Sequence, residues 1–104
     1  MRDLELKRKG NALEAVIQCE LDHHKAIGIR EEIDRALLSD KPKTLTLDFS
    51  AVPFMDSSGI GLIIGRADKA TQIGCQVRVS GLKQNLLRLV RLSGISKLEN
   101  VKID

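Results

Sequence analysis

Residues 44–72 read TLTLDFSAVPFMDSSGIGLIIGRADKATQ, with a strand pattern, a short loop and a helix pattern in direct succession. The first six residues alternate β-branched or polar side chains with apolar ones, which is typical of a half-buried strand. Residues 56–58, Asp-Ser-Ser, are of the types that cap a helix start. We therefore expect a strand over 44–49 and a helix over 57–72.

The rest of the chain continues this alternation of strand and helix patterns. The Gly10-Asn11 pair separates two alternating segments and suits a tight hairpin turn. Asp22 is the expected N-cap of a helix that ends before Pro42, because proline disfavours a helical conformation in the residue before it. The other expected elements are strands over about 3–9 and 12–19, this helix over about 23–39, a strand over 76–79, a helix over 82–92 and a weak strand over 98–103. The order predicts one α/β domain over 1–104, with an opening antiparallel hairpin, then parallel strands, and helices packed against the mixed sheet.

Composition excludes several classes of protein. A chain of 104 residues has room for a single domain. The net charge of +3 comes from basic residues interleaved with acids, and Phe49 and Phe54 are the only aromatic residues, so nucleic-acid binding is disfavoured. No apolar run approaches the ~20 residues that span a bilayer, and no signal-like segment opens the chain, so we expect a cytoplasmic protein. Cys19 and Cys75 are expected to be reduced, small core residues.

Glycine is distributed unusually in the helix expected over 57–72. On a wheel of 100° per residue, the arc expected to be buried holds Ile60, Ile63, Ile64, Ala67, Ala70 and Thr71, whereas Gly61, Leu62, Gly65, Arg66 and Lys69 lie outside it. A glycine inside a helix costs about 1 kcal/mol relative to alanine. The outward pair Gly61 and Gly65 therefore indicates either a flat surface for another protein, with Leu62 as an exposed apolar anchor, or close packing within the fold.

Ser58 projects on the wheel almost opposite the buried arc, whereas Ser57 projects near the edge of that arc. Ser58 has three possible roles, and the first is purely structural: Asp56 or Ser57 caps the helix, and Ser58 merely follows the cap. The second is that of a hydrolase nucleophile, although the Gly-x-Ser-x-Gly elbow is absent. The third is that of a phosphate acceptor, because a phosphate at a helix start meets free N–H groups and the positive end of the helix dipole. Its charge of about −1.5 to −2 would oppose docking on a flat, partly apolar surface.

Two further patterns predict neither a metal nor a cofactor. His23 and His24 are adjacent, so on a helix they point about 100° apart and cannot chelate one metal. We expect them to be exposed in the first helical turn after Asp22. The glycines of 59–65 superficially resemble a dinucleotide fingerprint, but their spacing is wrong and they fall inside the helix.

Three segments together resemble a known family. They are 54–61 (FMDSSGIG), 20–24 (ELDHH) and 88–95 (RLVRLSGI), which resemble the anti-sigma-factor antagonists of the STAS domain family, in particular its sporulation-type members. The resemblance implies that the unphosphorylated protein binds an anti-sigma factor that is also a GHKL-type serine kinase, and thereby frees a sigma factor. It further implies that this kinase phosphorylates Ser58, which releases the antagonist, and that a PP2C-type phosphatase restores it.

The same resemblance implies a non-catalytic regulator without a cofactor. The partner-binding residues that it implies, together with the wheel, are Asp22, His23, Asp56, Ser57, Ser58, Gly61, Leu62 and Gly65. In some relatives the modified residue lies one place earlier, so Ser57 is the second candidate for phosphorylation. The alternative function on this fold is that of an accessory subunit of a transport or lipid-trafficking complex, without a phosphorylation cycle.

Overall fold

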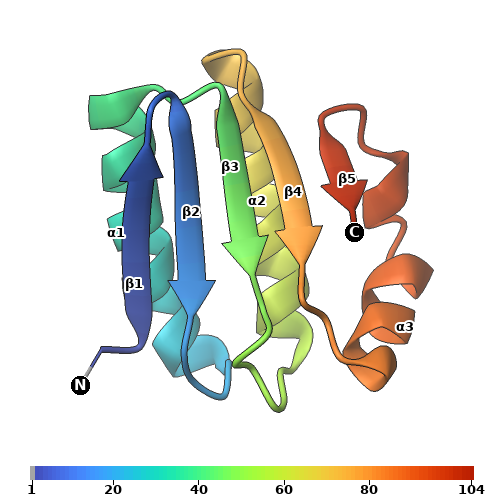
Figure 1. Ribbon diagram of the computed structural model, residues 1–104. Coiled ribbons are helices and arrows are strands. Elements are labelled where there is room, and N and C mark those ends of the chain that lie inside the picture. Colours follow the sequence, from blue (N-terminus) through green and yellow to red (C-terminus); the bar gives the residue numbers. More distant parts are fainter. Residues whose placement is uncertain (1) are drawn as a thin grey trace.

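The computed structural model describes residues 2–104. These residues form a five-stranded sheet, and helices cover one of its faces (Figure 1). In chain order the elements are β1 (Leu4–Lys9), β2 (Ala12–Ile17), α1 (His23–Asp40), β3 (Thr44–Asp48), α2 (Ser57–Gln72), β4 (Gln76–Ser80), α3 (Gln84–Leu92), the short 3-10 helix η1 (Ile95–Lys97) and β5 (Val101–Ile103). The predicted α/β class, with an opening hairpin followed by alternating helices and strands, is confirmed.

The strands lie in the sheet in their sequence order, β1-β2-β3-β4-β5. β1 and β2 are antiparallel, and every later pair of neighbours is parallel. Gly10, at φ 61°, makes the hairpin turn in the left-handed region that favours glycine. Leu13 pairs with Leu45, and Leu45 with Val77, so apolar residues align in rows across the face that the helices cover.

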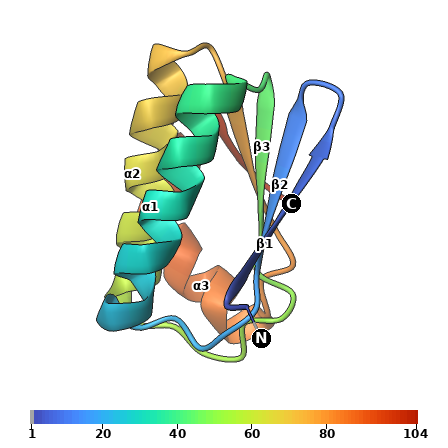
Figure 2. The same cartoon turned by 90° about the vertical axis from the view of Figure 1, so that its left-hand side faces the viewer.

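The opposite face of the sheet is polar. Figure 2 shows α1 and α2 on one side of the sheet, and no helix of the described chain lies on the other side. Alternation along the strands places Glu14, Thr46 and Arg78 in one row on this face. Arg78 is exposed there and pairs with Asp104, with 2.9 Å between Nη2 and Oδ2. One sheet face therefore meets water, and the core lies between the other face and the helices.

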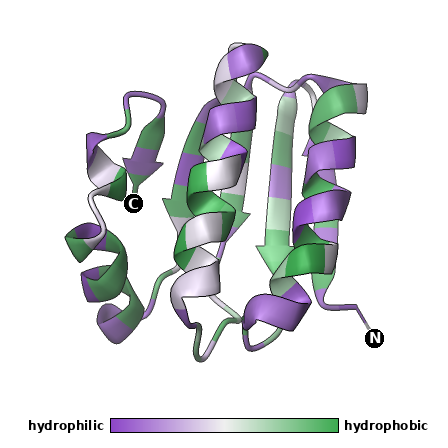
Figure 3. Ribbon diagram, turned by 180° about the vertical axis from the view of Figure 1, so that it is seen from behind, coloured by the Kyte–Doolittle hydropathy of each residue, from purple (hydrophilic) through white to green (hydrophobic). Residues whose placement is uncertain are grey.

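Each helix contributes apolar residues to that core. Figure 3 shows the outer side of α1 and α2, which carries many hydrophilic residues. α1 buries Ile29, Ile33, Ala36 and Leu37, and α3 buries Leu86 and Val90. Both cysteines are free thiols, with Cys75 buried and Cys19 packed at the edge of the core. Burial raises the pKa of each thiol.

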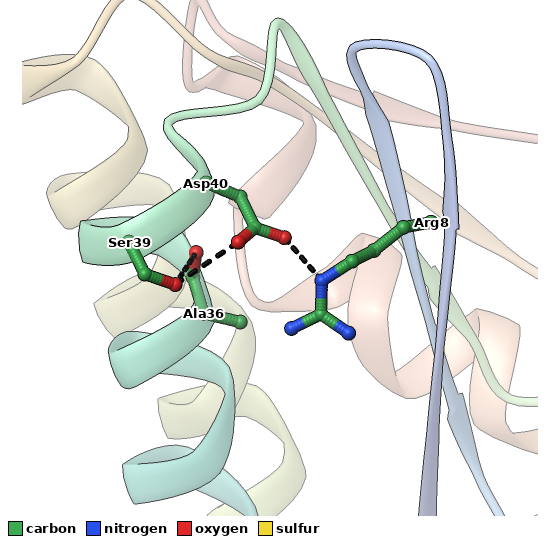
Figure 4. Close-up of polar contacts among 4 residues, drawn as sticks. All are labelled: Arg8, Ala36, Ser39 and Asp40. Carbon is green, nitrogen blue, oxygen red and sulfur yellow. Dashed lines mark hydrogen bonds and ion pairs between the residues drawn. The ribbon is translucent and has the colours of Figure 1, made fainter.

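The C-terminal end of α1 is attached to β1 (Figure 4). Arg8 forms an ion pair with Asp40, and Ser39 Oγ lies 3.0 Å from Asp40 Oδ1 and 3.3 Å from the carbonyl oxygen of Ala36. The hydrogen bond from Arg8, followed by that from Ser39, lowers the pKa of Asp40. Lys41 then adopts a left-handed conformation and donates its N–H to the carbonyl of Leu37. This ends the helix just before Pro42, as expected.

Two predicted boundaries differ from the structure near the C-terminus. The helix predicted over 82–92 begins only at Gln84, because the residue before it, Lys83, is the N-cap and has an extended backbone. The last strand spans Val101–Ile103 and not 98–103, since η1 comes before it and the chain after η1 must first turn.

Candidate partner-binding site

The starts of α1 and α2 are joined by main-chain hydrogen bonds. Leu21 and Met55, both buried, form an isolated parallel bridge. The N–H of Leu21 donates to the carbonyl of Phe54 at 3.0 Å, and the N–H of Asp56 donates to the carbonyl of Leu21 at 3.2 Å. The two helix caps, Asp22 and Asp56, directly follow the bridged residues Leu21 and Met55, so the starts of α1 and α2 are neighbours.

Both aspartates cap their helices. Asp22 Oδ1 accepts from the N–H of Lys25 at 2.8 Å, and Asp56 Oδ1 accepts from the N–H of Ser58 at 2.8 Å. The hydrogen bonds from Ser58 lower the pKa of Asp56, and the charge of His23 acts in the same direction. Asp56 is therefore held as a carboxylate at the positive end of the α2 dipole, and the predicted caps are confirmed.

The two serines of the motif differ from the prediction in their exposure. Ser57 is exposed, whereas Ser58 is half-buried at the side of α2 that faces α1. Ser58 lines a hollow of about 190 Å³ between the two helices. The full lining of this hollow, which we call the α1–α2 hollow, is His23, Ala26, Ile27, Arg30, Ser58, Gly61 and Leu62. The wheel placed Ser58 free in solvent because it did not include α1 as a neighbour of α2.

The same neighbour changes the buried face of α2. Leu62 is only 3% exposed, so the prediction that it is an exposed apolar anchor is wrong. Arg66, also expected outside the buried arc, is equally buried, while Ile64 and Thr71 are exposed although both were predicted to be buried. α2 packs against β4 on one side and α1 on the other, which rotates and widens its buried arc toward α1. The residues that α2 buries are Gly59, Leu62, Ile63, Arg66, Ala67 and Ala70.

Arg66 forms an ion pair across the helix interface. Its Nε lies 2.6 Å from Oδ1 of Asp34 on α1, and the side chains are 3% and 19% exposed. Burial lowers the pKa of Arg66, the charge of Asp34 opposes this effect, and the like charge of Arg30 adds to it. Within residues 2–104, Arg66 Nε and Nη1 and Asp34 Oδ1 are all buried without a hydrogen-bond partner, so the contact is an ion pair without hydrogen-bond geometry. The pair holds α1 and α2 together further along the helices than Ser58.

The glycines of α2 have two different roles. A Cβ at Gly61 or Gly65 would meet no atom within 4 Å, so close packing within the fold does not require them. This contradicts the packing interpretation and leaves the flat-surface interpretation for the exposed Gly61 and the half-buried Gly65. By contrast, a Cβ at Gly59 would meet the side chain of Met55, which would have to shift, so the packing of the helix start favours glycine at this position.

Exposed apolar side chains beside the motif come from residues that sequence reasoning missed. Phe54, in the bridged loop, is 56% exposed, and Ile27, which lines the α1–α2 hollow, is 38% exposed. A large apolar residue just before the Asp56 cap was a usable signal for Phe54, but Ile27 only gains its meaning from the packing of α1 beside α2. We call the surface formed by His23, Ile27, Phe54, Ser57, Ser58 and Gly61 the motif surface.

The described residues contain no group of three His, Cys, Asp or Glu side chains that could hold a metal ion. His23 and His24 are both exposed in the first turn of α1. None of the helices in residues 2–104 combines the length and the apolar character needed to cross a membrane.

Known proteins are similar to this chain in sequence and in fold. The STAS domain family matches residues 3–103. The anti-sigma F factor antagonist of Paenibacillus polymyxa is 30% identical over 95 residues, which cover 91% of this chain and 81% of that protein. The anti-sigma-B factor antagonist of Bacillus subtilis (strain 168) is 23% identical over 99 residues, or 95% and 89% of the two chains. The Bacillus cell fate determinant SpoIIAA in its phosphorylated form aligns with a TM-score of 0.75 at 24% identity, covering 97% of this chain and 90% of that one. The chain therefore belongs to the STAS domain family.

Proposed function

We propose that this protein is an anti-sigma factor antagonist. In its unphosphorylated form it binds an anti-sigma factor that is also a serine kinase, and this binding releases a sigma factor. The similarity to proteins named anti-sigma F and anti-sigma-B factor antagonists supports the class. The observation that carries the proposal is the position of Ser58, capped by Asp56 at the start of α2 and next to the exposed Gly61.

The motif surface has the features of a docking site for a protein. Ile27, which lines the α1–α2 hollow with Ser58, and Phe54, in the loop before α2, provide exposed apolar side chains, and Gly61 lets a partner approach the helix backbone. Asp22 and His23 lie at the start of α1, where they form the polar rim of this surface. Gly65, one turn beyond Gly61, extends the flat area. Leu62, which is buried, supports this surface from below and does not contact the partner.

Phosphorylation of Ser58 would end the interaction. Its hydroxyl oxygen forms a bond with the γ-phosphorus of the kinase's ATP, the bond to ADP breaks, and the hydroxyl proton passes to a base that the kinase supplies. The product carries about −1.5 to −2 charges on a surface that the partner must dehydrate. A PP2C-type phosphatase then hydrolyses the phosphate ester and restores the binding form. All acid–base residues and the ATP site belong to the GHKL-type kinase and the phosphatase, and this chain acts without catalysis or a cofactor.

Mapping the phosphate tests the proposal. The protein is incubated with its cognate anti-sigma kinase and ATP, and the modified residue is located by mass spectrometry, with Ser57→Ala and Ser58→Ala as matched variants. We expect phosphate on Ser58 in the wild type and in Ser57→Ala, and none in Ser58→Ala. Phosphate confined to Ser57, which is the more exposed serine, would transfer the role to the second candidate.

Binding measured by calorimetry provides the second test. Ser58→Ala should bind the kinase like the wild type, whereas Ser58→Asp should bind more than tenfold more weakly, a loss above about 1.4 kcal/mol. Ser57→Asp is the control for a negative charge one residue away. Equal affinity of Ser58→Asp and the wild type, or co-purification with membrane transporter subunits in place of a kinase, would contradict the proposal.

A further inference from the structure

The α1–α2 hollow contains basic groups beside the hydroxyl of Ser58. Ser58 is half-buried and lines this hollow with His23 and Arg30, which lie two turns apart on α1. The phosphate of a modified Ser58 would thus be attached at the edge of a hollow whose opposite wall carries a guanidinium and an imidazole.

Arg30 is a cation that the described chain leaves without an acidic partner. Asp34, four residues further along α1, would be its usual helical partner, but Asp34 pairs with the buried Arg66. Arg30 belongs to none of the four ion pairs that residues 2–104 form. Its charge is close enough to Arg66 to lower the pKa of that residue. Asp34 therefore compensates only one of two neighbouring guanidinium groups, and the other, the exposed Arg30, lines the hollow.

The acidic groups near the hollow are also occupied. Asp56 accepts the N–H of Ser58, and Asp22 accepts the N–H of Lys25, so both carboxylates are committed to helix N–H groups. His23 acts electrostatically on Asp56 and lines the same hollow. A phosphate would find Arg30 uncompensated, with His23 two turns away on the same wall of the hollow.

We propose that Arg30 binds the phosphate of phosphorylated Ser58 within the α1–α2 hollow, with His23 as a second contact, so that the modified protein holds its phosphate against its own surface. This inference rests on the proposed phosphorylation of Ser58. A guanidinium presents several N–H donors in one plane and can bind two phosphate oxygens at once, which makes it the best-suited side chain for this contact. The positive end of the α2 dipole adds to the attraction.

Intramolecular binding has consequences that do not involve the kinase. A neighbouring guanidinium favours the dianion, so it lowers the second pKa of the phosphate below its ordinary value of about 6. The contact also adds an interaction between α1 and α2, so the phosphorylated chain should melt at a higher temperature than the unmodified chain. Finally, a bound phosphate is less accessible to a phosphatase.

The test uses the full chain with phosphoserine incorporated at position 58 during translation, so it needs neither the kinase nor the sigma factor. The second pKa of the phosphate is measured by ³¹P NMR between pH 4.5 and 8. We expect Arg30→Gln to raise it by about half a pH unit or more, and to remove the rise in melting temperature that phosphorylation causes. The comparison is repeated in a His23→Gln background, which separates the contribution of Arg30 from that of the second proposed contact.

Two controls separate this contact from general effects of charge. Arg35→Gln removes an exposed arginine of α1 that does not line the hollow, and it should leave the pKa of the phosphate unchanged. Phosphoserine placed at the exposed position 57 should not respond to Arg30→Gln. In addition, alkaline phosphatase should release phosphate several-fold faster from the Arg30→Gln protein than from the wild type.

The outcomes distinguish this inference from the proposed function. If Arg30→Gln and Arg35→Gln leave the same pKa at phosphoserine 58, the inference is overturned, even if phosphorylation abolishes kinase binding. If the pKa depends on Arg30 but phosphoserine 58 binds the kinase like the unmodified chain, the inference stands and the proposed function fails.

Discussion

Arg66 on α2 and Asp34 on α1 form a buried ion pair, with Nε 2.6 Å from Oδ1, between the two helices that carry the motif surface. A guanidinium excluded from water is costly unless a carboxylate and hydrogen bonds compensate for it. Asp34, whose side chain is partly exposed, provides the carboxylate. The pair therefore fixes the packing of α1 against α2, and with it the shape of the α1–α2 hollow.

Removing Asp34 should destabilise the fold strongly. We expect Asp34→Ala to lower the free energy of unfolding by about 3 kcal/mol, because Arg66 then remains buried and unpaired. Arg66→Met should cost less, since methionine fills the space and the remaining carboxylate can reach water. Urea unfolding measures both, and the exposed Arg35→Ala on α1 should stay within about 0.5 kcal/mol of the wild type. A loss for Asp34→Ala as small as that of this control would contradict the structural role of the pair.

Gly61→Ala should separate stability from binding. A Cβ at Gly61 meets nothing within 4 Å, so alanine should stabilise the helix by up to about 1 kcal/mol. The same methyl group stands on the motif surface and should weaken binding to the anti-sigma kinase. Gly28→Ala on α1, where a Cβ also has open space, is the matched control: it should give a similar gain in melting temperature without a change in affinity. Unchanged affinity in Gly61→Ala would show that the partner does not approach α2 at this residue.

Truncating Ile27 should weaken kinase binding without unfolding the protein. Ile27 is 38% exposed and lines the α1–α2 hollow, so Ile27→Ala should lose roughly tenfold in affinity, or about 1.4 kcal/mol. Leu38 is 71% exposed on the same helix, about 16 Å further along its axis, and Leu38→Ala should bind normally. Calorimetry on both variants checks the prediction. If the two variants lose affinity equally, the contact surface extends well beyond the motif.

Asp56 should make the stability depend on pH. Its pKa in the folded protein is lowered, first by the hydrogen bonds from Ser58. A lowered folded-state pKa means that the stabilisation is complete above the unfolded-chain value of about 3.9 and is lost as the pH falls through the folded-state value. Asp56→Asn, which keeps a capping oxygen but no charge, should be less stable than the wild type at pH 7 and should approach it below pH ~3.

Urea midpoints at pH 7, 4 and 2.5 measure this convergence for Asp56→Asn. Asp68→Asn, on an exposed part of α2, controls for the loss of one negative charge. A difference between Asp56→Asn and the wild type that stays constant over this range would mean that the carboxylate charge contributes nothing at the helix start.

Local patterns were sufficient to predict the elements of this fold. The helix expected over 57–72 has those bounds in the structure, because its N-cap and its apolar spacing are encoded within the segment itself. The cap at Asp22 was predictable for the same reason. The position of α2 beside α1 could not be predicted in this way, since a helical wheel describes one helix against one neighbour. The errors at Leu62 and Ile64 follow from that second neighbour.

The sequence motif of the candidate site was predictable, but the residues that surround it in the folded protein were not. The Asp-Ser-Ser-Gly segment marked Ser58, but its half-buried position and its proximity to Arg30 depend on residues about thirty positions away in the chain. Ile27 and Arg30 lie on faces of α1 that carry no distinctive sequence signal. They become part of the site only because the loops before α1 and α2 are joined.

The bridge between Leu21 and Met55 also limits how the protein can respond to modification. The N–H of Asp56 donates to the carbonyl of Leu21, so displacing one helix start would break main-chain bonds that also hold the other. A phosphate added to Ser58 would therefore change the electrostatic potential of a rigid frame and would not relocate a segment. The rate of such a response would be set by phosphoryl transfer to Ser58 and by hydrolysis of the phosphate ester, without a refolding step.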